Sequence, residues 1–246
     1  GFRWFREFFS SVYFGRLIKN TLLISIYSLI IGFPIPIIFA LLLNEIKDGP
    51  FKRVTQTISY LPHFISVVVV VGLLFNFLSP IDGVVNVLLK SMGKDAINCM
   101  SEPGWFRTLY IGSNIWQNFG WDSIIYLAAL SSVDPQLYEA AQIDGAGKFK
   151  QMLHVTLPAI MPTIIILLIM NVGNIMNVGF EKIILMYSPA TYETADVIST
   201  YVYRRGILGS QFSFSASVGL FNSVINFALL FTVNKISNRV SEISLW

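Results

Sequence analysis

The chain has 246 residues, of which 54% are hydrophobic and 13% are charged, and its mean hydropathy is +0.64. The charged share is about half of what soluble domains usually carry, so the composition indicates a membrane protein. A net charge of +3 without a dense basic cluster gives no support for nucleic-acid binding. Cys99 is the only cysteine, which excludes an intrachain disulfide and a cysteine metal site.

The first residues, from Phe2 to Phe9, mix aromatic and basic side chains. This pattern is typical of an amphipathic helix that lies at a membrane surface. We therefore expect the chain to begin with an interfacial helix rather than with a membrane span.

Five later segments are long enough to cross a bilayer, which takes roughly 20 apolar residues. Pro34 and Pro36 fall inside the first of them and predict a kink. The segment 108–130 ranks last of the five in hydropathy, because it carries several polar side chains. Together the segments predict an all-α membrane protein whose spans cover residues 22–43, 58–78, 108–130, 155–180 and 212–233.

Polar side chains recur at helical spacing in the segment 108–130. Asn114, Asn118 and Asp122 are four residues apart, and Gln117 and Trp121 lie beside them, so all five form one stripe on a helix. Such groups face protein or water rather than lipid. They can line a polar cavity, or they can hydrogen-bond to a neighbouring helix.

Two other spans carry similar asparagines. In the segment 155–180, Asn171, Asn174 and Asn177 fall within an arc of about 120° on a helix. In the last span, Asn226 follows Asn222 by one helical turn. Helix packing is again the alternative to cavity lining. The predicted solute-pathway residues are Asn114, Gln117, Asn118, Trp121, Asp122, Asn171, Asn174, Asn177 and Asn222.

Aromatic side chains and a histidine also lie in these segments. Trp116 and Trp121 can stack on sugar rings, or they can act as interface anchors or packing residues. His63 follows Pro62 near the start of an apolar segment, and we interpret it as a packing histidine.

No catalytic pattern is present in the sequence. His63 and His154 are far apart and lack metal-ligand spacing. The phosphate-binding motif G-x-x-x-x-G-K-[ST] is absent, so this chain is not itself an ATPase, and no G-x-S-x-G motif occurs. We expect no catalytic residue, no metal site and no cofactor bound by this chain.

The polar segment 131–158 lies between two apolar segments and has its own local pattern. Asp134 can cap a helix that starts at Pro135. Gly145 permits a sharp turn, a second short helix can follow, and Pro158 is expected to restart a membrane helix. Such a helix–turn–helix can pass force from a soluble motor protein to the membrane.

The run EAAQIDGAGKFKQMLHVTLP resembles the EAA loop of ABC importer permeases, the membrane subunits of binding-protein-dependent uptake systems. Val155 stands where isoleucine is usual. The segments NTLLISIYSLIIGFPIPIIFALLLNEI and WFRTLYIGSNIWQN are similar to the oligosaccharide branch. The positions that match the loop pattern are Glu139, Ala140, Ala141, Gly145, Val155, Leu157 and Pro158.

The resemblance implies a type I ABC importer transmembrane subunit for a sugar or oligosaccharide, with one permease domain over residues 1–246. Family members normally have a further span before the segment that corresponds to Gly1. We therefore expect six spans in the natural chain, of which five are in this sequence. A complete five-span chain is the alternative. The residues implied to couple to the ATPase are Glu139, Ala140, Ala141, Asp144, Gly145, Leu157 and Pro158.

The implied partners are a second homologous permease, two ATPase subunits that hold ATP and Mg, an extracytoplasmic solute-binding protein and membrane lipid. The implied location is the bacterial inner membrane, crossed several times. Lysine and arginine counts do not decide the orientation. The resemblance places residues 131–154 in the cytoplasm and residues 181–211 outside.

The alternative function is a self-sufficient ion-coupled secondary transporter or channel. It would use Asp122 or Glu181, because carboxylates within membranes are functional candidates. It would leave the loop 131–158 without an evident purpose. A membrane enzyme is a weaker alternative, since no nucleophile and base are paired. The residues do not fix the solute, and a peptide, opine or phosphate stays open beside a sugar.

Overall fold

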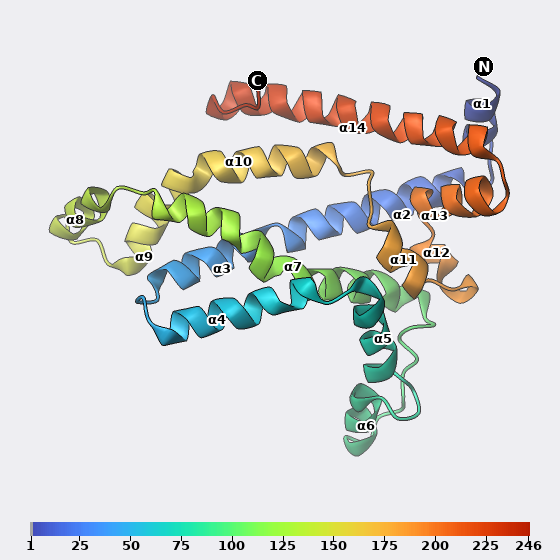
Figure 1. Ribbon diagram of the computed structural model, residues 1–246, viewed down its shortest axis with the longest axis horizontal. Helices are drawn as coiled ribbons and strands as arrows, with labels where there is room; N and C mark the ends of the chain where they lie inside the picture. The colour runs from blue at the N-terminus through green and yellow to red at the C-terminus, as the bar shows by residue number, and fades with distance from the viewer. Residues whose placement is uncertain (1) are drawn as a thin grey trace. The chain divides into compact units, whose positions relative to one another are not determined.

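The computed structural model describes residues 2–246, and these residues form helices and connecting turns with no strand among them (Figure 1). They group into two units, each assembled from three stretches of the chain. The first unit comprises Gly1–Ser28, Ile65–Asn114 and Ile175–Asn226, and the second comprises Leu29–Phe64, Ile115–Asn174 and Phe227–Trp246.

Among its described residues, the first unit contains seven complete α-helices: α1 (Arg3–Phe9), α2 (Phe14–Tyr27), α5 (Val67–Phe77), α6 (Val84–Ser91), α11 (Phe180–Met186), α12 (Tyr192–Ala195) and α13 (Ile198–Val202). The second contains α3 (Pro34–Glu45), α4 (Pro50–Tyr60), α8 (Pro135–Ile143), α9 (Lys148–Gln151) and α10 (Leu157–Gly173). The two longest helices each contribute to both units: α7 (Pro103–Ser131) and α14 (Phe212–Ser241).

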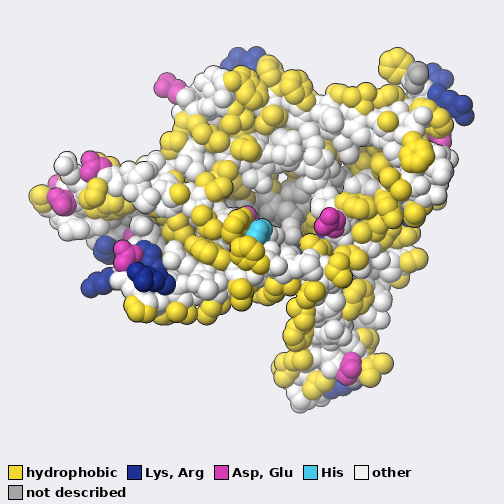
Figure 2. All heavy atoms as spheres, viewed as in Figure 1, with side chains coloured by type: hydrophobic (Ala, Val, Ile, Leu, Met, Phe, Trp, Pro, Cys, Tyr) yellow, Lys and Arg dark blue, Asp and Glu magenta, His cyan; other side chains and the backbone are white. Residues whose placement is uncertain are grey.

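Within the described residues, three helical stretches are long and apolar enough to cross a membrane: Phe14–Glu45, Lys148–Gly173 and α14. The pair Pro50–Phe64 and Val67–Phe77 adds a fourth if its two bent parts count as one span. α7 has 29 residues, and its polar side chains keep it outside that set. These helices lie where the five spans are predicted. Hydrophobic side chains cover much of the face in Figure 2, as lipid contact requires.

Two predicted spans differ from the structure. The segment 58–78 is not one helix, because the chain bends by 97° between its two helical parts and Ser66 caps α5 by accepting the N–H of Val69. The segment 155–180 is helical only to Gly173. Asn174 and Asn177 lie beyond that end, so the shared helical arc predicted for them with Asn171 is wrong. Glycine and asparagine are weak helix formers, which explains the early end.

Prolines inside two spans each follow a π-helical segment. Ser28–Gly32 precedes Pro34, and Met152–Thr156 precedes Pro158. A proline lacks an N–H and its ring clashes with the carbonyl four residues earlier, and a wider π turn accommodates both defects. Pro158 therefore lies in the first turn of the membrane helix α10, as predicted. The π turn joins this helix to α9, so helical structure is continuous from Lys148 to Gly173.

Each unit has its own apolar core. In the first, Phe8 is fully buried, and its ring contacts those of Phe14, Phe214 and Phe221. α1 is therefore not simply an interfacial helix, because Phe8 anchors it in this core. In the second unit, buried side chains of α3, α7 and α10 meet; they are Ile37, Ala40, Leu41, Tyr126, Leu130 and Ile160.

α4 and α7 approach closely within the second unit. A side-chain carbon built at Gly120 would lie 2.1 Å from the carbonyl oxygen of Ser59. Only glycine fits there, so this residue fixes how α7 passes α4, within the part of α7 that carries the polar stripe.

Candidate coupling loop and solute pathway

The turn between α8 and α9 is built by local hydrogen bonds. The Asp134 carboxylate accepts the N–H of Gln136 at 2.9 Å, which confirms the predicted cap. At the other end of α8, the N–H of Ala146 donates to the Ala141 carbonyl at 2.8 Å. Gly145 has φ of +77°, a left-handed conformation that favours glycine, as its position in the sequence predicts.

Two further contacts hold this turn to the helix that enters the membrane, and a third joins the start of that helix to α3. The Gln151 amide donates to the Ala146 carbonyl at 2.7 Å, and the hydroxyls of Tyr138 and Thr156 lie 3.1 Å apart. Lys148 lies 3.6 Å from the Glu45 carboxylate at the end of α3. The loop is therefore mechanically connected to the span Lys148–Gly173.

The predicted coupling residues do not share one surface. Glu139, Ala140, Asp144 and Gly145 are exposed and Ala141 is half-buried, all on α8 or the turn after it. Leu157 packs against the core of its unit, and Pro158 lies in the first turn of α10. Leu157 and Pro158 thus belong to the helix α10 itself, while the first five positions lie on α8 or the turn after it.

Apolar side chains flank the turn and were missed by the sequence reasoning. Ile143 is 88% exposed and Phe149 is 71% exposed. These exposed apolar groups are candidates for contact with a partner protein. The sequence signal is that Ile143 lies between a glutamine and an aspartate, and Phe149 lies between two lysines.

The polar stripe of α7 is confirmed as helical, and its members differ in burial. Gln117 is buried, Asn118 is half-buried and Asp122 is exposed. The Asn118 amide oxygen lies 3.0 Å from Nδ1 of His63. Asn118 is thereby tied to the bent segment that connects α4 and α5.

An aromatic shelf, formed by His63, Phe64 and Trp121, lies beside Asn118. The His63 and Trp121 rings are parallel at 4.5 Å, and Phe64 meets Trp121 edge-on at 5.4 Å. Trp121 is 41% exposed, so part of the indole is open to a ligand. Aromatic faces suit the C–H side of a sugar ring. His63 is a packing residue, as interpreted, and also completes this shelf.

The other predicted pathway asparagines have different environments. The side chains of Asn171 and Asn174 donate to carbonyls one turn earlier, at 2.8 and 3.1 Å. Asn226 is buried and accepts the N–H of Met176, so it fits the packing alternative. The amide oxygen of Asn222 is buried without a hydrogen-bond partner among residues 2–246.

A buried charge cluster in the first unit was not foreseen. Asp196 is fully buried, and its carboxylate meets Arg204 at 2.8 Å and Arg16 at 3.1 Å. Asn20 donates to the Asp196 carbonyl and accepts a hydrogen bond from Arg107 at 2.8 Å. Arg204, in the 181–211 segment, is therefore engaged within the fold.

Comparison with known proteins decides the family. The family model described as "Binding-protein-dependent transport system inner membrane component" matches residues 32–242. The chain belongs to this family. It is a permease subunit of an ABC importer, and the ion-coupled alternative is set aside.

Individual relatives agree with that assignment. "Protein LplB" of Bacillus subtilis is 43% identical over all of this chain and 77% of its own length. The "Polygalacturonan/rhamnogalacturonan transport system permease protein YteP" of the same organism is 43% identical over 98% of this chain and 75% of its own. The crystal structure of a bacterial alginate ABC transporter, in complex with an alginate pentasaccharide-bound periplasmic protein, contains a similar subunit. Its TM-score is 0.96 at 48% identity, over 100% of this chain and 85% of the other.

Proposed function

We propose that this chain forms half of the translocation pathway of an oligosaccharide importer in the bacterial inner membrane. A second homologous permease supplies the other half, a binding protein delivers the solute from outside, and two ATPase subunits bind ATP and Mg. The names of relatives that transport or bind polysaccharides support the substrate class. Only 6% of the apolar window of α14 is buried within the chain, which leaves surface for lipid and for the second permease.

The exposed turn of the coupling loop is the observation that carries this mechanism. Ile143 and Phe149 present apolar side chains on either side of Gly145, and a cleft in an ATPase would cover them. Movement of that cleft would pass through the Tyr138–Thr156 contact to the span Lys148–Gly173. ATP supplies the driving free energy by binding more tightly to one conformation than to the other, so the permease performs no chemistry.

The aromatic shelf and the polar stripe supply the solute contacts in this proposal. Trp121 would stack on a sugar ring, and Asn118 and Asp122 would hydrogen-bond to its hydroxyls. His63 would hold Asn118 in place through their 3.0 Å contact. Asn222, in the first unit, stays a separate prediction, because its buried and unpartnered amide oxygen can accept a hydrogen bond from a solute hydroxyl.

The test is Ile143→Asp, which places a charge in the proposed apolar contact. We expect the variant to insert normally, to lose the ATPase subunits during purification and to abolish uptake. Ile81→Asp is the matched control, because Ile81 is 83% exposed and lies in the loop after α5, on the opposite side in the proposed topology. Retention of the ATPase by Ile143→Asp, with normal uptake, would refute the coupling role.

The orientation is tested separately with a cysteine at Ser210, which is exposed just before α14. With Cys99 replaced, a membrane-impermeant thiol reagent should label it from outside intact cells. Labelling only after permeabilisation would invert the proposed topology.

A further inference from the structure

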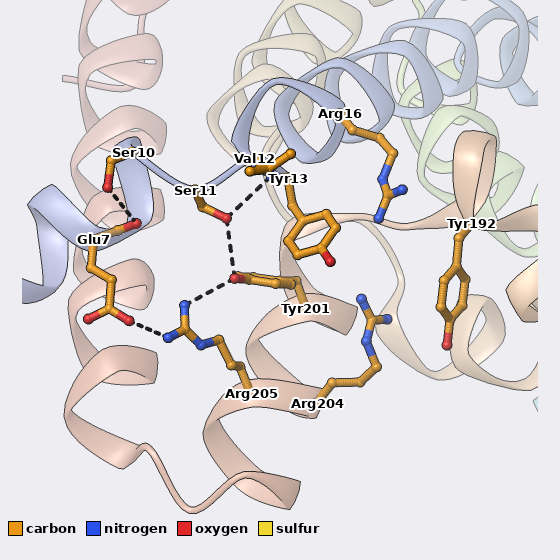
Figure 3. Close-up of a pocket in the computed structure, with 10 residues that line it drawn as sticks. All are labelled: Glu7, Ser10, Ser11, Val12, Tyr13, Arg16, Tyr192, Tyr201, Arg204 and Arg205. Carbon is orange, nitrogen blue, oxygen red and sulfur yellow. Dashed lines mark hydrogen bonds and ion pairs between the residues drawn. The ribbon is translucent and has the colours of Figure 1, made fainter.

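An open cavity of about 870 Å³ lies in the first unit, and none of its lining residues belongs to the aromatic shelf. It is formed by α1 and the turn after it, the first part of α2, α12, and the stretch from α13 through the following π-helical turn (Figure 3). This volume lies in the range of pockets that bind small organic ligands. Its lining residues are Glu7, Ser10, Ser11, Val12, Tyr13, Arg16, Tyr192, Tyr201, Arg204 and Arg205.

Three guanidinium groups converge on this cavity from two parts of the chain, Arg16 from α2 and Arg204 and Arg205 from the π-helical turn (Figure 3). The carboxylates that contact them are Asp196, behind Arg16 and Arg204, and Glu7, beside Arg205. Three positive charges face two negative ones, so the lining retains an excess positive charge. A neutral ligand would gain nothing from that excess, whereas an anion would.

The arginines are held in place with donors to spare. Arg204 is fixed by Asp196 and lies over the Tyr192 ring at 4.7 Å. Arg205 donates to the Tyr201 hydroxyl at 3.2 Å and pairs with Glu7. Each guanidinium carries five N–H donors, more than these contacts use. Such preorganised, planar groups are suited to a carboxylate.

Aromatic rings complete the lining. Tyr13, Tyr192 and Tyr201 border the cavity beside the arginines (Figure 3). Their faces suit the C–H side of a sugar ring, and their hydroxyls can exchange hydrogen bonds with sugar hydroxyls. Tyrosines alone would accept many sugars. Tyrosines interleaved with arginines favour a sugar that carries a carboxylate.

We propose that this arginine–tyrosine cavity is an entry site for a uronate-bearing oligosaccharide, whose carboxylate binds Arg205 and its neighbouring guanidiniums. The inference rests on the proposed function, which it deepens by naming an acidic substrate class. In the proposed topology the cavity lies at the outer end of the span Phe14–Glu45, where a binding protein would release its solute.

The experiment uses the permease–ATPase complex in lipid nanodiscs without binding protein. Calorimetry measures the affinity for trigalacturonate and for its neutral methyl ester. Arg205→Gln should weaken trigalacturonate binding about tenfold, as expected for loss of a charged hydrogen bond, and leave ester binding unchanged. Glu7→Gln should strengthen trigalacturonate binding, because it frees Arg205. Arg239→Gln, an exposed arginine near the end of α14, is the control.

If Arg205 and Glu7 had a merely structural role, both changes would weaken trigalacturonate binding alike. Opposite effects of Arg205→Gln and Glu7→Gln therefore exclude that role. Equal affinity of wild type and both variants for trigalacturonate would overturn the inference. The inference would also be overturned if Arg205→Gln lost binding-protein docking while its trigalacturonate affinity stayed unchanged. The carboxylate that Arg205 binds would then belong to the binding protein. If the complex takes up neutral and acidic oligosaccharides without preference, the inference is overturned and the proposed function stands. Failure to take up any saccharide overturns the proposed function as well.

Discussion

The coupling loop and the Asp196 cluster are both polar, and the chain builds them in different ways. Hydrogen bonds in the loop join residues 2, 5 and 18 positions apart. In the cluster, Arg204 is only 8 positions from Asp196, but the other contacts join residues 87 to 180 positions apart, as in the pair Arg16–Asp196. The loop is therefore a product of local sequence, whereas the cluster exists only when distant helices have packed.

The two regions also differ in what their residues contribute. The loop side chains are mostly exposed and add little to the free energy of unfolding. Asp196 is fully buried, so its charge depends on its partners. Changes in the cluster should lower stability, and changes in the loop should lower transport at nearly constant stability.

Asp196→Ala should give the largest effect on stability. It leaves Arg16 and Arg204 facing each other without the shared carboxylate and removes an acceptor for Thr200. Loss of one member of a buried ion pair costs about 3–5 kcal/mol, and partial exposure of both arginines reduces this to about 2–4 kcal/mol. The measurement is the thermal unfolding midpoint of the purified complex in detergent.

Asp48→Asn is the matched control for that change. Asp48 pairs with Lys52 at 2.9 Å, and its side chain is 95% exposed. We expect its unfolding midpoint to equal that of wild type. If the Asp196 and Asp48 variants unfold at the same temperature, the distinction between the two regions does not hold.

Gly145→Val should lower transport with a smaller effect on stability. Nothing lies within 4 Å of a side chain built there, so the cost comes from the backbone at φ +77°, of the order of 1–3 kcal/mol for a strained residue. Relaxation of the turn would reorient α8 relative to α9. Uptake should fall while the amount of inserted protein stays constant.

Gly147 provides the control two residues away. It is equally unhindered, and its φ of −69° is allowed for any residue. Gly147→Val should therefore retain much more uptake than Gly145→Val. Equal uptake by both variants and wild type would show that the shape of this turn does not matter.

The same contrast explains what could be predicted from the sequence. The Asp134 cap and the Gly145 turn follow from neighbouring residues and are confirmed. The continuity of the helix across Met152–Thr156 is not predicted, because a π turn that absorbs a proline leaves no separate sequence signal. His63 stacks on Trp121 from 58 positions away, which helical periodicity alone cannot reveal.

The stripe on α7 gives a third prediction, on solute access. Single cysteines at Asn114, Asn118 and Asp122 should react with small hydrophilic thiol reagents, at rates that change when ATP analogues trap the complex. Ile124 and Leu127, which lie away from the stripe, should react slowly. Uniform protection of all three polar positions in every nucleotide state would assign the stripe to helix packing.

Cys99 is replaced in these experiments, although its own reactivity should be low. It is 7% exposed, and burial raises the pKa of its thiol, so little thiolate forms at neutral pH. Rapid labelling of the unsubstituted protein would show that the loop before α7 opens in solution.

Glu45→Gln should have the smallest effect and gives the finest test of the local character of the coupling loop. Lys148 and Glu45 are 3.6 Å apart, with side chains 77% and 29% exposed, so water and salt screen their attraction. Exposed pairs of this kind contribute about 0.2–1 kcal/mol. Because the Asp134 cap and the Tyr138–Thr156 contact remain, we expect a shift in the unfolding midpoint that high salt abolishes, with uptake unchanged. If Glu45→Gln lost as much uptake as Gly145→Val, the end of α3 would set the position of the loop. The loop would then depend on distant packing, as the Asp196 cluster does.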